Sequence, residues 1–162
     1  MTISMETSAR TAVRPATPDD RVPWRLLLSA DGPRAEVGKY LSRGELWLAE
    51  RDSEVVGEMV LLQTRADVWE IMNLAVSRAL HRHGIGTSLL RKARAVARQR
   101  GARRLEVGTS SSGIGQLAFY QRFGFRIVGV DTDFFAGRWR TIVRENGIPV
   151  RDMVRMAIAF DT

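Results

Sequence analysis

Hydrophobic and polar positions alternate along the chain in two distinct patterns. Runs rich in β-branched and apolar residues predict strands over residues 11–16, 45–51, 54–63, 67–76, 104–108, 125–130 and 153–160. Helical spacing predicts a helix that starts at Pro18-Asp19-Asp20 and stops at Asp31-Gly32-Pro33, followed by helices over 35–41, 84–100 and 115–123. This order predicts an α/β fold of the α+β mixed-sheet type. About seven strands and four helices are expected, with an antiparallel N-terminal half and a central parallel strand pair reached by a right-handed crossover.

The clearest helix, over residues 84–100, directly follows the most apolar strand, over 67–76. Its apolar stripe is Ile85, Leu89, Ala93, Val96 and Ala97. Between strand and helix lie the basic loop His81-Arg82-His83 and the turn Gly84-Ile85-Gly86-Thr87. Free backbone N–H groups and the positive end of a helix dipole meet at such a turn, and glycine lets an anion approach the backbone. The pattern therefore predicts an anion-binding cradle.

Composition narrows the class of protein. The 162 residues, 44% of them hydrophobic, suit one domain over residues 11–162, preceded by a flexible tail over 1–10 that lacks the apolar core of a signal peptide. No apolar run reaches the length of a membrane span, so a cytoplasmic protein without a membrane partner is expected. Cysteine is absent and both histidines share one loop, so no metal site is predicted.

The positive charge is concentrated around the predicted cradle. Ser77 to Val107 holds nine Arg or Lys and one Glu, a local balance of +8 within a total of +7. A small polyanionic ligand and nucleic acid would each explain the excess, and a solvated helix face is the third interpretation. A dinucleotide fingerprint is incomplete, because Leu89 stands where the third glycine belongs, and no P-loop motif is present.

Two segments resemble the GNAT superfamily of N-acetyltransferases. The loop His81-Arg82-His83-Gly84-Ile85-Gly86 is similar to that family's coenzyme A loop, Arg/Gln-x-x-Gly-x-Gly/Ala, with histidine in the first place. The segment Phe119-Tyr120-Gln121-Arg122-Phe123-Gly124-Phe125 is similar to its later Tyr-x-x-x-Gly-Phe segment. The resemblance covers residues 11–160 and points to an uncharacterised bacterial subgroup. It implies the GNAT-like fold and acetyl-CoA as the acetyl donor.

The resemblance also implies which residues contact the cofactor. Backbone N–H groups from Arg82 to Thr87 would hold the pyrophosphate, and the strand edge at Leu74 to Val76 would hold the pantetheine arm. The N–H of Leu74 would bind the thioester oxygen, and Ser111 stands where an asparagine is common. The full expected set is Leu74, Ala75, Val76, His81, Arg82, His83, Gly84, Ile85, Gly86, Thr87, Ser111 and Tyr120.

Acetyl transfer to an amine needs a base for the ammonium and an acid for the leaving thiolate. By the same resemblance Tyr120 is the general acid, although a core tyrosine is the alternative. Glu70 matches the place of a general base in some members, acting directly or through water. Burial would raise the pKa of Glu70, and the alternative is an ion pair with an arginine on an adjacent strand.

The acceptor site is expected near Trp24 and in the loop 131–152, which carries Asp133, Phe134 and Phe135. These aromatic residues could instead pack the loop on the sheet. With no cysteine for an acyl-enzyme, the resemblance implies direct attack by a primary amine of a small molecule or peptide in a ternary complex. A non-catalytic acyl-CoA sensor and a nucleic-acid-binding module are the alternatives. The acceptor's identity, the choice of an acetyl or a longer acyl group on the donor, and the choice of monomer or homodimer stay open.

Overall fold

The computed structural model describes residues 10–161 and is built on a seven-stranded sheet of order β1-β2-β3-β4-β5-β9-β6. Every neighbouring pair is antiparallel except β4 and β5, which run parallel. A separate two-stranded hairpin, β7 with β8, lies between β6 and β9. The strands are β1 (Ala12–Pro15), β2 (Glu45–Arg51), β3 (Glu54–Arg65), β4 (Val68–Val76), β5 (Arg104–Ser110), β6 (Arg126–Asp131), β7 (Arg144–Glu145), β8 (Ile148–Pro149) and β9 (Met153–Ala159).

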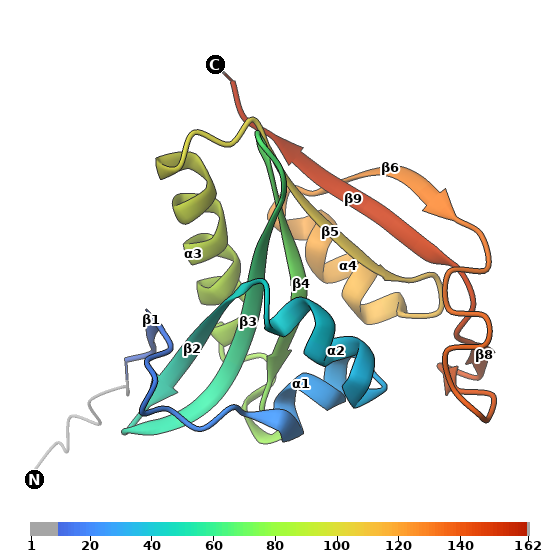
Figure 1. Cartoon of the computed structure of the whole chain (residues 1–162), viewed down its shortest axis with the longest axis horizontal. Coiled ribbons are helices and arrows are strands. Elements are labelled where there is room, and N and C mark those ends of the chain that lie inside the picture. The colour runs from blue at the N-terminus through green and yellow to red at the C-terminus, as the bar shows by residue number, and fades with distance from the viewer. Residues whose placement is uncertain (1–9, 162) are drawn as a thin grey trace, which may run out of the picture.

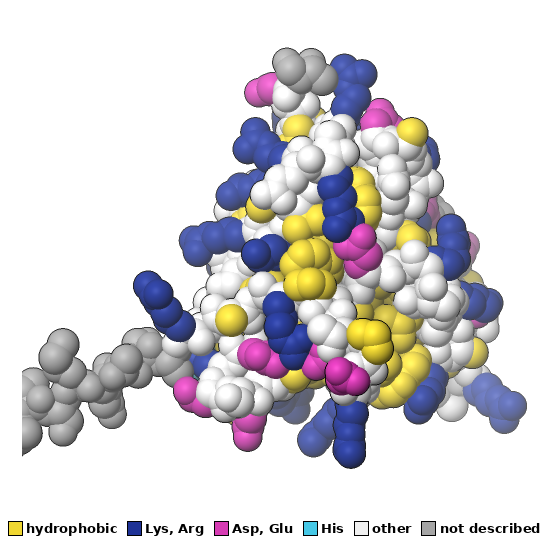
Figure 2. All heavy atoms as spheres, turned by 60° about the vertical axis from the view of Figure 1, so that its left-hand side comes forward, with side chains coloured by type: hydrophobic (Ala, Val, Ile, Leu, Met, Phe, Trp, Pro, Cys, Tyr) yellow, Lys and Arg dark blue, Asp and Glu magenta, His cyan; other side chains and the backbone are white. Residues whose placement is uncertain are grey.

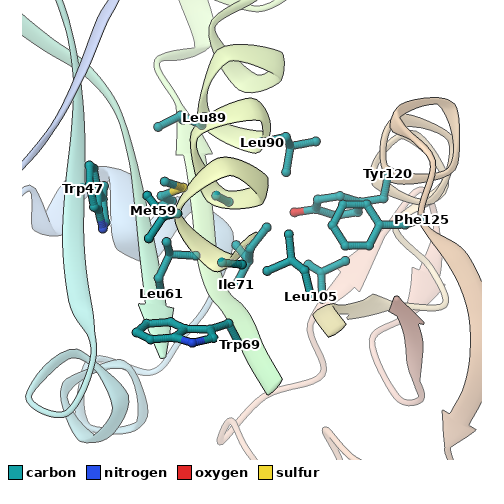
Figure 3. Close-up of a cluster of buried hydrophobic side chains, with 14 of the residues drawn as sticks. Trp47, Met59, Leu61, Trp69, Ile71, Leu89, Leu90, Leu105, Tyr120 and Phe125 are labelled. Atoms are coloured by element: carbon teal, nitrogen blue, oxygen red, sulfur yellow. The ribbon is translucent and has the colours of Figure 1, made fainter. Parts of the chain in front are cut away.

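Helices cover both faces of the sheet (Figure 1). Helices α3 (Ile85–Gln99) and α4 (Ile114–Phe123) enclose the larger core, which includes Leu89, Leu105 and Phe125 (Figure 3). Helices α1 (Trp24–Ala30) and α2 (Arg34–Leu41) enclose a smaller core against the other face. A short 3₁₀ turn, η1 (Arg78–Leu80), follows β4. None of the helices in residues 10–161 has the length and apolar character that a membrane crossing requires.

The predicted fold class is confirmed, down to the seven-stranded sheet, the four α-helices and the parallel pair. One helix start was wrong: α1 begins at Trp24 rather than at Pro18-Asp19-Asp20. Asp20 instead accepts hydrogen bonds from Arg14 and from the Thr17 backbone, which fixes a turn. The β7–β8 hairpin was not predicted within its long loop. The predicted tail over 1–10 lies outside the described residues except for Arg10.

Strands β4 and β5 separate after a short paired stretch. Only Val68 to Ile71 pairs with β5, while β4 continues to Val76 and β5 to Ser110 (Figure 1). The pairing of β4 with β3 skips Met72, since Val60 faces Asn73 and Leu61 faces Ile71. This bulge bends β4 away from β5 and leaves one edge of its last residues unpaired. An opening in the middle of the sheet is the result.

Candidate active site

The turn between β4 and α3 has the geometry of an anion cradle. Arg82 and Gly84 both have left-handed backbones, with φ of 66° and 78°, and α3 begins at the next residue, Ile85. No side chain caps this helix end, so the N–H groups of its first turn keep their bonding capacity for a ligand. The His81 ring donates from Nε2 to the Val76 carbonyl at 2.9 Å, which ties the turn to the end of β4.

Gly86 also serves the packing of two helices. A Cβ atom at this position would lie 3.0 Å from the Phe119 ring on α4. A larger residue would therefore require the Phe119 ring to shift. The missing side chain supports close helix packing in addition to any approach of a ligand.

The opening between β4 and β5 leads into a cavity of ≈ 830 Å³. One wall comes from α1, α2 and their connection, and the other from the loop between β6 and β9. Leu74, Glu70 and Tyr120 line it together, as do Phe134 and Phe135. Trp24 lies outside this lining, packed in the smaller core with the Arg34 guanidinium 4.0 Å from its ring centroid. Asp133 also lies outside it and accepts a 2.6 Å hydrogen bond from Arg151. Ser111 sits at the end of β5, where its N–H donates to the Asp152 carbonyl.

Tyr120 reaches the cavity from the larger core. Its ring packs at 5.3 Å from that of Phe119 and edge-on at 5.7 Å from that of Phe125. Its hydroxyl points toward the side of β4 that carries Ile71 (Figure 3). Burial raises the pKa of the phenol, so it carries its proton at neutral pH. The arrangement suits a proton donor.

Glu70 has features of both roles that the sequence allowed, a general base and the partner of an arginine in an ion pair. Its carboxylate accepts a 3.1 Å hydrogen bond from Arg155 on β9, which lies two strands away rather than adjacent. Burial raises the pKa of Glu70, and the Arg155 charge opposes that rise. The carboxylate still lines the cavity. An ion pair and a proton-accepting position therefore coexist at this residue.

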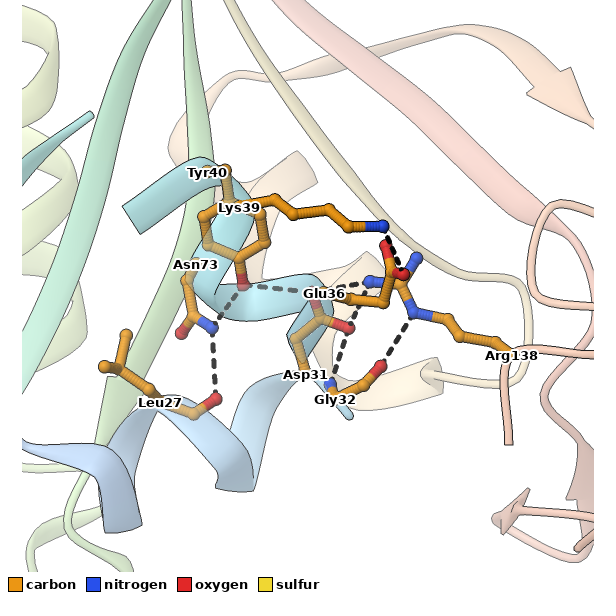
Figure 4. A network of polar contacts seen from close by, with 8 residues as sticks. All are labelled: Leu27, Asp31, Gly32, Glu36, Lys39, Tyr40, Asn73 and Arg138. Carbon is orange, nitrogen blue, oxygen red and sulfur yellow. Dashed lines mark hydrogen bonds and ion pairs between the residues drawn. The ribbon is translucent and has the colours of Figure 1, made fainter. Parts of the chain in front are cut away.

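A polar network that the sequence did not reveal joins the two walls of the cavity (Figure 4). Asn73 on β4 donates to the Leu27 carbonyl at 3.0 Å and to the Tyr40 hydroxyl at 2.9 Å. Tyr40 donates to Asp31 at 3.0 Å. Arg138, from the far loop, pairs with Asp31 at 3.1 Å and donates to the Gly32 carbonyl at 2.7 Å. More than one hundred positions separate Arg138 from Asp31, so no local pattern could connect them.

The hairpin is anchored at the start of α4. Glu145 accepts hydrogen bonds from the Ser112 hydroxyl at 3.2 Å and from Gln116 at 3.4 Å. Asn146 donates to the Ser112 carbonyl at 2.8 Å. A carboxylate beside a helix N-terminus is favoured by the helix dipole. These contacts hold the second wall of the cavity in place.

Glu58 on β3 is a further residue that the sequence reading missed. The structure buries it completely, and neither carboxylate oxygen has a hydrogen-bond partner among the described residues. Burial raises the pKa of Glu58 to about 8. The backbone N–H of Ala75 lies near the carboxylate and lowers this pKa by a smaller amount, but it does not reach the geometry of a hydrogen bond. Its only sequence signal was a charged residue within an apolar run, Val55 to Leu62.

The basic residues of α3 are largely occupied on the protein itself. Arg94 and Arg98 place their guanidinium groups over the rings of Phe123 and Phe160, and Arg100 pairs with Glu45. On the face shown in Figure 2, Lys and Arg side chains are interspersed with acidic and neutral ones. Within residues 10–161, no group of three or more His, Asp or Glu side chains could hold a metal ion.

Three comparisons place the chain among known proteins. Residues 13–125 match the model of the acetyltransferase (GNAT) family. The uncharacterized N-acetyltransferase YvbK of Bacillus subtilis is 44% identical over 133 residues, which cover 82% of this chain and 86% of that protein.

Solved structures agree with this relationship. A GNAT family acetyltransferase from Elizabethkingia anophelis with acetyl-CoA bound superposes with a TM-score of 0.89 at 34% identity, covering 93% of this chain and 98% of that one. A Bacillus subtilis acetyltransferase in complex with CoA gives a TM-score of 0.87 at 38% identity, covering 94% and 100%. The sheet with its central opening, the matched segment and these relatives lead to one conclusion: this chain belongs to the GNAT family of acetyltransferases.

Proposed function

We propose that this protein transfers the acetyl group of acetyl-CoA to a primary amine of a small molecule or peptide by direct attack within a ternary complex. One observation carries the proposal. The unpaired edge of β4, the carboxylate of Glu70 and the phenol of Tyr120 line the same cavity, next to an uncapped helix N-terminus. That is where a thioester would meet both an acid and a base.

The donor would lie along β4 with its diphosphate on the turn before α3. Backbone N–H groups from Arg82 to Thr87 would hold the diphosphate, with His81 and His83 beside them. The free edge at Leu74, Ala75 and Val76 would bind the pantetheine amides as an added strand does. Ser111 would support the arm from β5. The acetyl-CoA seen in the Elizabethkingia relative supports this assignment of the donor.

Two side chains would transfer the protons, one as a base and one as an acid. Glu70 would take a proton from the acceptor's ammonium, directly or through water, so that the neutral nitrogen attacks the thioester carbon. The Leu74 N–H would stabilise the developing negative charge on the oxygen. The C–S bond then breaks, and Tyr120 would give its proton to the departing thiolate of coenzyme A. No covalent acyl-enzyme is needed.

The acceptor would occupy the cavity between the two walls. Phe134 and Phe135 would provide an apolar surface. Trp24 would act from outside the lining by supporting Arg34, which lines the cavity. Asp133 and its partner Arg151 both lie outside the lining, so Asp133 is assigned no contact with the acceptor.

The test is a panel of primary amines incubated with the protein and acetyl-CoA and read by release of free thiol. Acetylation of at least one amine, confirmed by mass spectrometry and lost in Tyr120→Phe, supports the proposal. Binding of acetyl-CoA without turnover on any amine, peptides included, would instead indicate a sensor. The control is Thr64→Val, which removes a hydroxyl at the exposed end of β3, outside the cavity lining.

A further inference from the structure

Glu58 and Asn73 are neighbours on one face of the central sheet. Glu58 pairs with Ala75, and Asn73 pairs with Val60, so the two side chains lie diagonally across adjacent strands. This face carries α1 and α2, because Asn73 bonds to Leu27 and Tyr40 there. Diagonal neighbours are within reach of a long side chain such as glutamate.

Glu58 and Asn73 together have more buried hydrogen-bond acceptors than donors. Both carboxylate oxygens of Glu58 and the Asn73 Oδ1 atom are buried without a partner among the described residues. The amide cannot be turned over to correct this, because its Nδ2 faces the Leu27 carbonyl, which only accepts. Three unsatisfied acceptors in one buried region are costly, and a single added proton on Glu58 would relieve two of them.

The surroundings disfavour a charge on Glu58. Burial raises its pKa to about 8. Two titratable side chains lie close enough to feel its charge. Tyr40 of α2 is packed on the same face of the sheet, and Tyr120 of α4 comes from the larger core on the other face. Burial raises the pKa of both phenols, and the Glu58 carboxylate adds to that rise. No cation among the described residues pairs with Glu58.

We propose that Glu58 is a positioning residue that works as a neutral carboxylic acid, donating its proton to Asn73 Oδ1 and so fixing the floor of the acceptor cavity. The floor is held because Asn73 in turn bonds to α1 and to the Tyr40 hydroxyl, and both Asn73 and Tyr40 line the cavity. Neutral Glu58 thus acts on the acceptor side through Asn73.

Its protonation also matters to the reaction, and this part rests on the proposed function. Glu58 lies opposite Ala75, within the strand segment assigned to the thioester. A carboxylate at that place would repel the negative charge that develops on the thioester oxygen, whereas a neutral acid would not. Loss of the proton would therefore weaken both the floor and the oxyanion site.

Glu58→Gln separates this role from that of a base, because its amide donates a hydrogen bond at every pH and never ionises. We expect Glu58→Gln to keep turnover close to wild type at pH 7. Wild-type activity should decline as the pH passes about 8, and the variant should not show this decline. A fall in turnover as large as that of Glu70→Gln would make Glu58 a base and overturn the proposal.

Two measurements do not depend on turnover. The infrared difference spectrum of wild type minus Glu58→Gln should show a carboxylic-acid carbonyl band at pH 7 that disappears above about pH 8. The side-chain amide resonances of Asn73 should titrate together with that band in wild type and stay constant in Glu58→Gln. A carboxylate band at pH 7, or Asn73 resonances indifferent to pH, would refute the assignment even if no acceptor amine is ever found.

Further variants isolate the hydrogen bond. Glu58→Met fills the space without a donor, so we expect a raised KM for the acceptor and unchanged calorimetric affinity for acetyl-CoA. An unchanged KM would argue against positioning through Asn73. Glu54→Gln, at the exposed start of the same strand, is the matched control and should leave every readout as in wild type. If Glu58→Met does not fold, the pH titration of the wild type still decides the outcome.

Discussion

Arg155 on β9 donates a 3.1 Å hydrogen bond to Glu70 on β4, although β5 lies between their strands. The same guanidinium donates to Asp131 at 2.7 Å and lies 5.2 Å from the centroid of the Phe134 ring. One side chain therefore connects the candidate base, the end of β6 and the aromatic wall of the cavity. The positive charge of Arg155 lowers the pKa of Glu70 by direct contact across β5.

Replacing Arg155 should shift the pH dependence of catalysis. Arg155→Met removes the charge that lowers the pKa of Glu70 and leaves the burial that raises it. The acid limb of kcat/KM should therefore move to higher pH. Arg151→Met removes a cation that pairs with Asp133 at the surface instead, and its profile should match wild type. An acid limb that stays in place in Arg155→Met would show that Glu70 does not set it.

Removing one hydroxyl tests the candidate acid. Tyr120→Phe keeps the ring contacts with Phe119 and Phe125, so the fold should be preserved. Turnover should fall at least about tenfold, since a positioned general acid contributes that much or more. Calorimetric affinity for acetyl-CoA should hardly change. Equal turnover in the two proteins would remove Tyr120 from the acid role.

The cradle can be tested without damage to helix packing. Gly86 is unsuitable, because a side chain there meets Phe119. Thr87→Glu instead puts a negative charge in the first turn of α3, where the dipole favours it for stability but where it repels a diphosphate. We expect an unchanged or higher melting temperature and weaker binding of coenzyme A, which calorimetry measures. Thr87→Gln is the uncharged control of equal size. Normal binding by Thr87→Glu would place the diphosphate elsewhere.

The link between Asp31 and Arg138 should couple the two walls of the cavity. Both side chains are mostly buried, so breaking the pair leaves one charge poorly compensated. A double-mutant cycle with Asp31→Asn and Arg138→Met should give a coupling free energy of about 1 kcal/mol or more in urea unfolding. Each single variant should also raise KM for the acceptor. Additive effects on stability would mean that the walls are held independently.

Local patterns predicted most of the elements. The apolar stripe from Ile85 to Ala97 could be recognised because the helical period and burial coincide there. The strand over 67–76 could be recognised because most of its residues are apolar. The start of α1 was misread because Asp20 imitates a helix cap. Only the folded chain brings Arg14 to its carboxylate, where it makes a turn instead.

The residues of the candidate site also fall into two groups, those that local sequence identified and those that only the folded structure revealed. Tyr120, Glu70 and the turn from His81 to Thr87 stand in short contiguous segments, so the sequence by itself identified them as candidates. It also determined the fold class and the family. Tertiary structure alone decided that Asn73 meets Tyr40, that Arg138 reaches Asp31, and that Glu58 is buried without a partner. The physical reason is that backbone periodicity and helix ends act over a few neighbouring residues. Burial and charge pairing depend instead on which distant segments the sheet brings together.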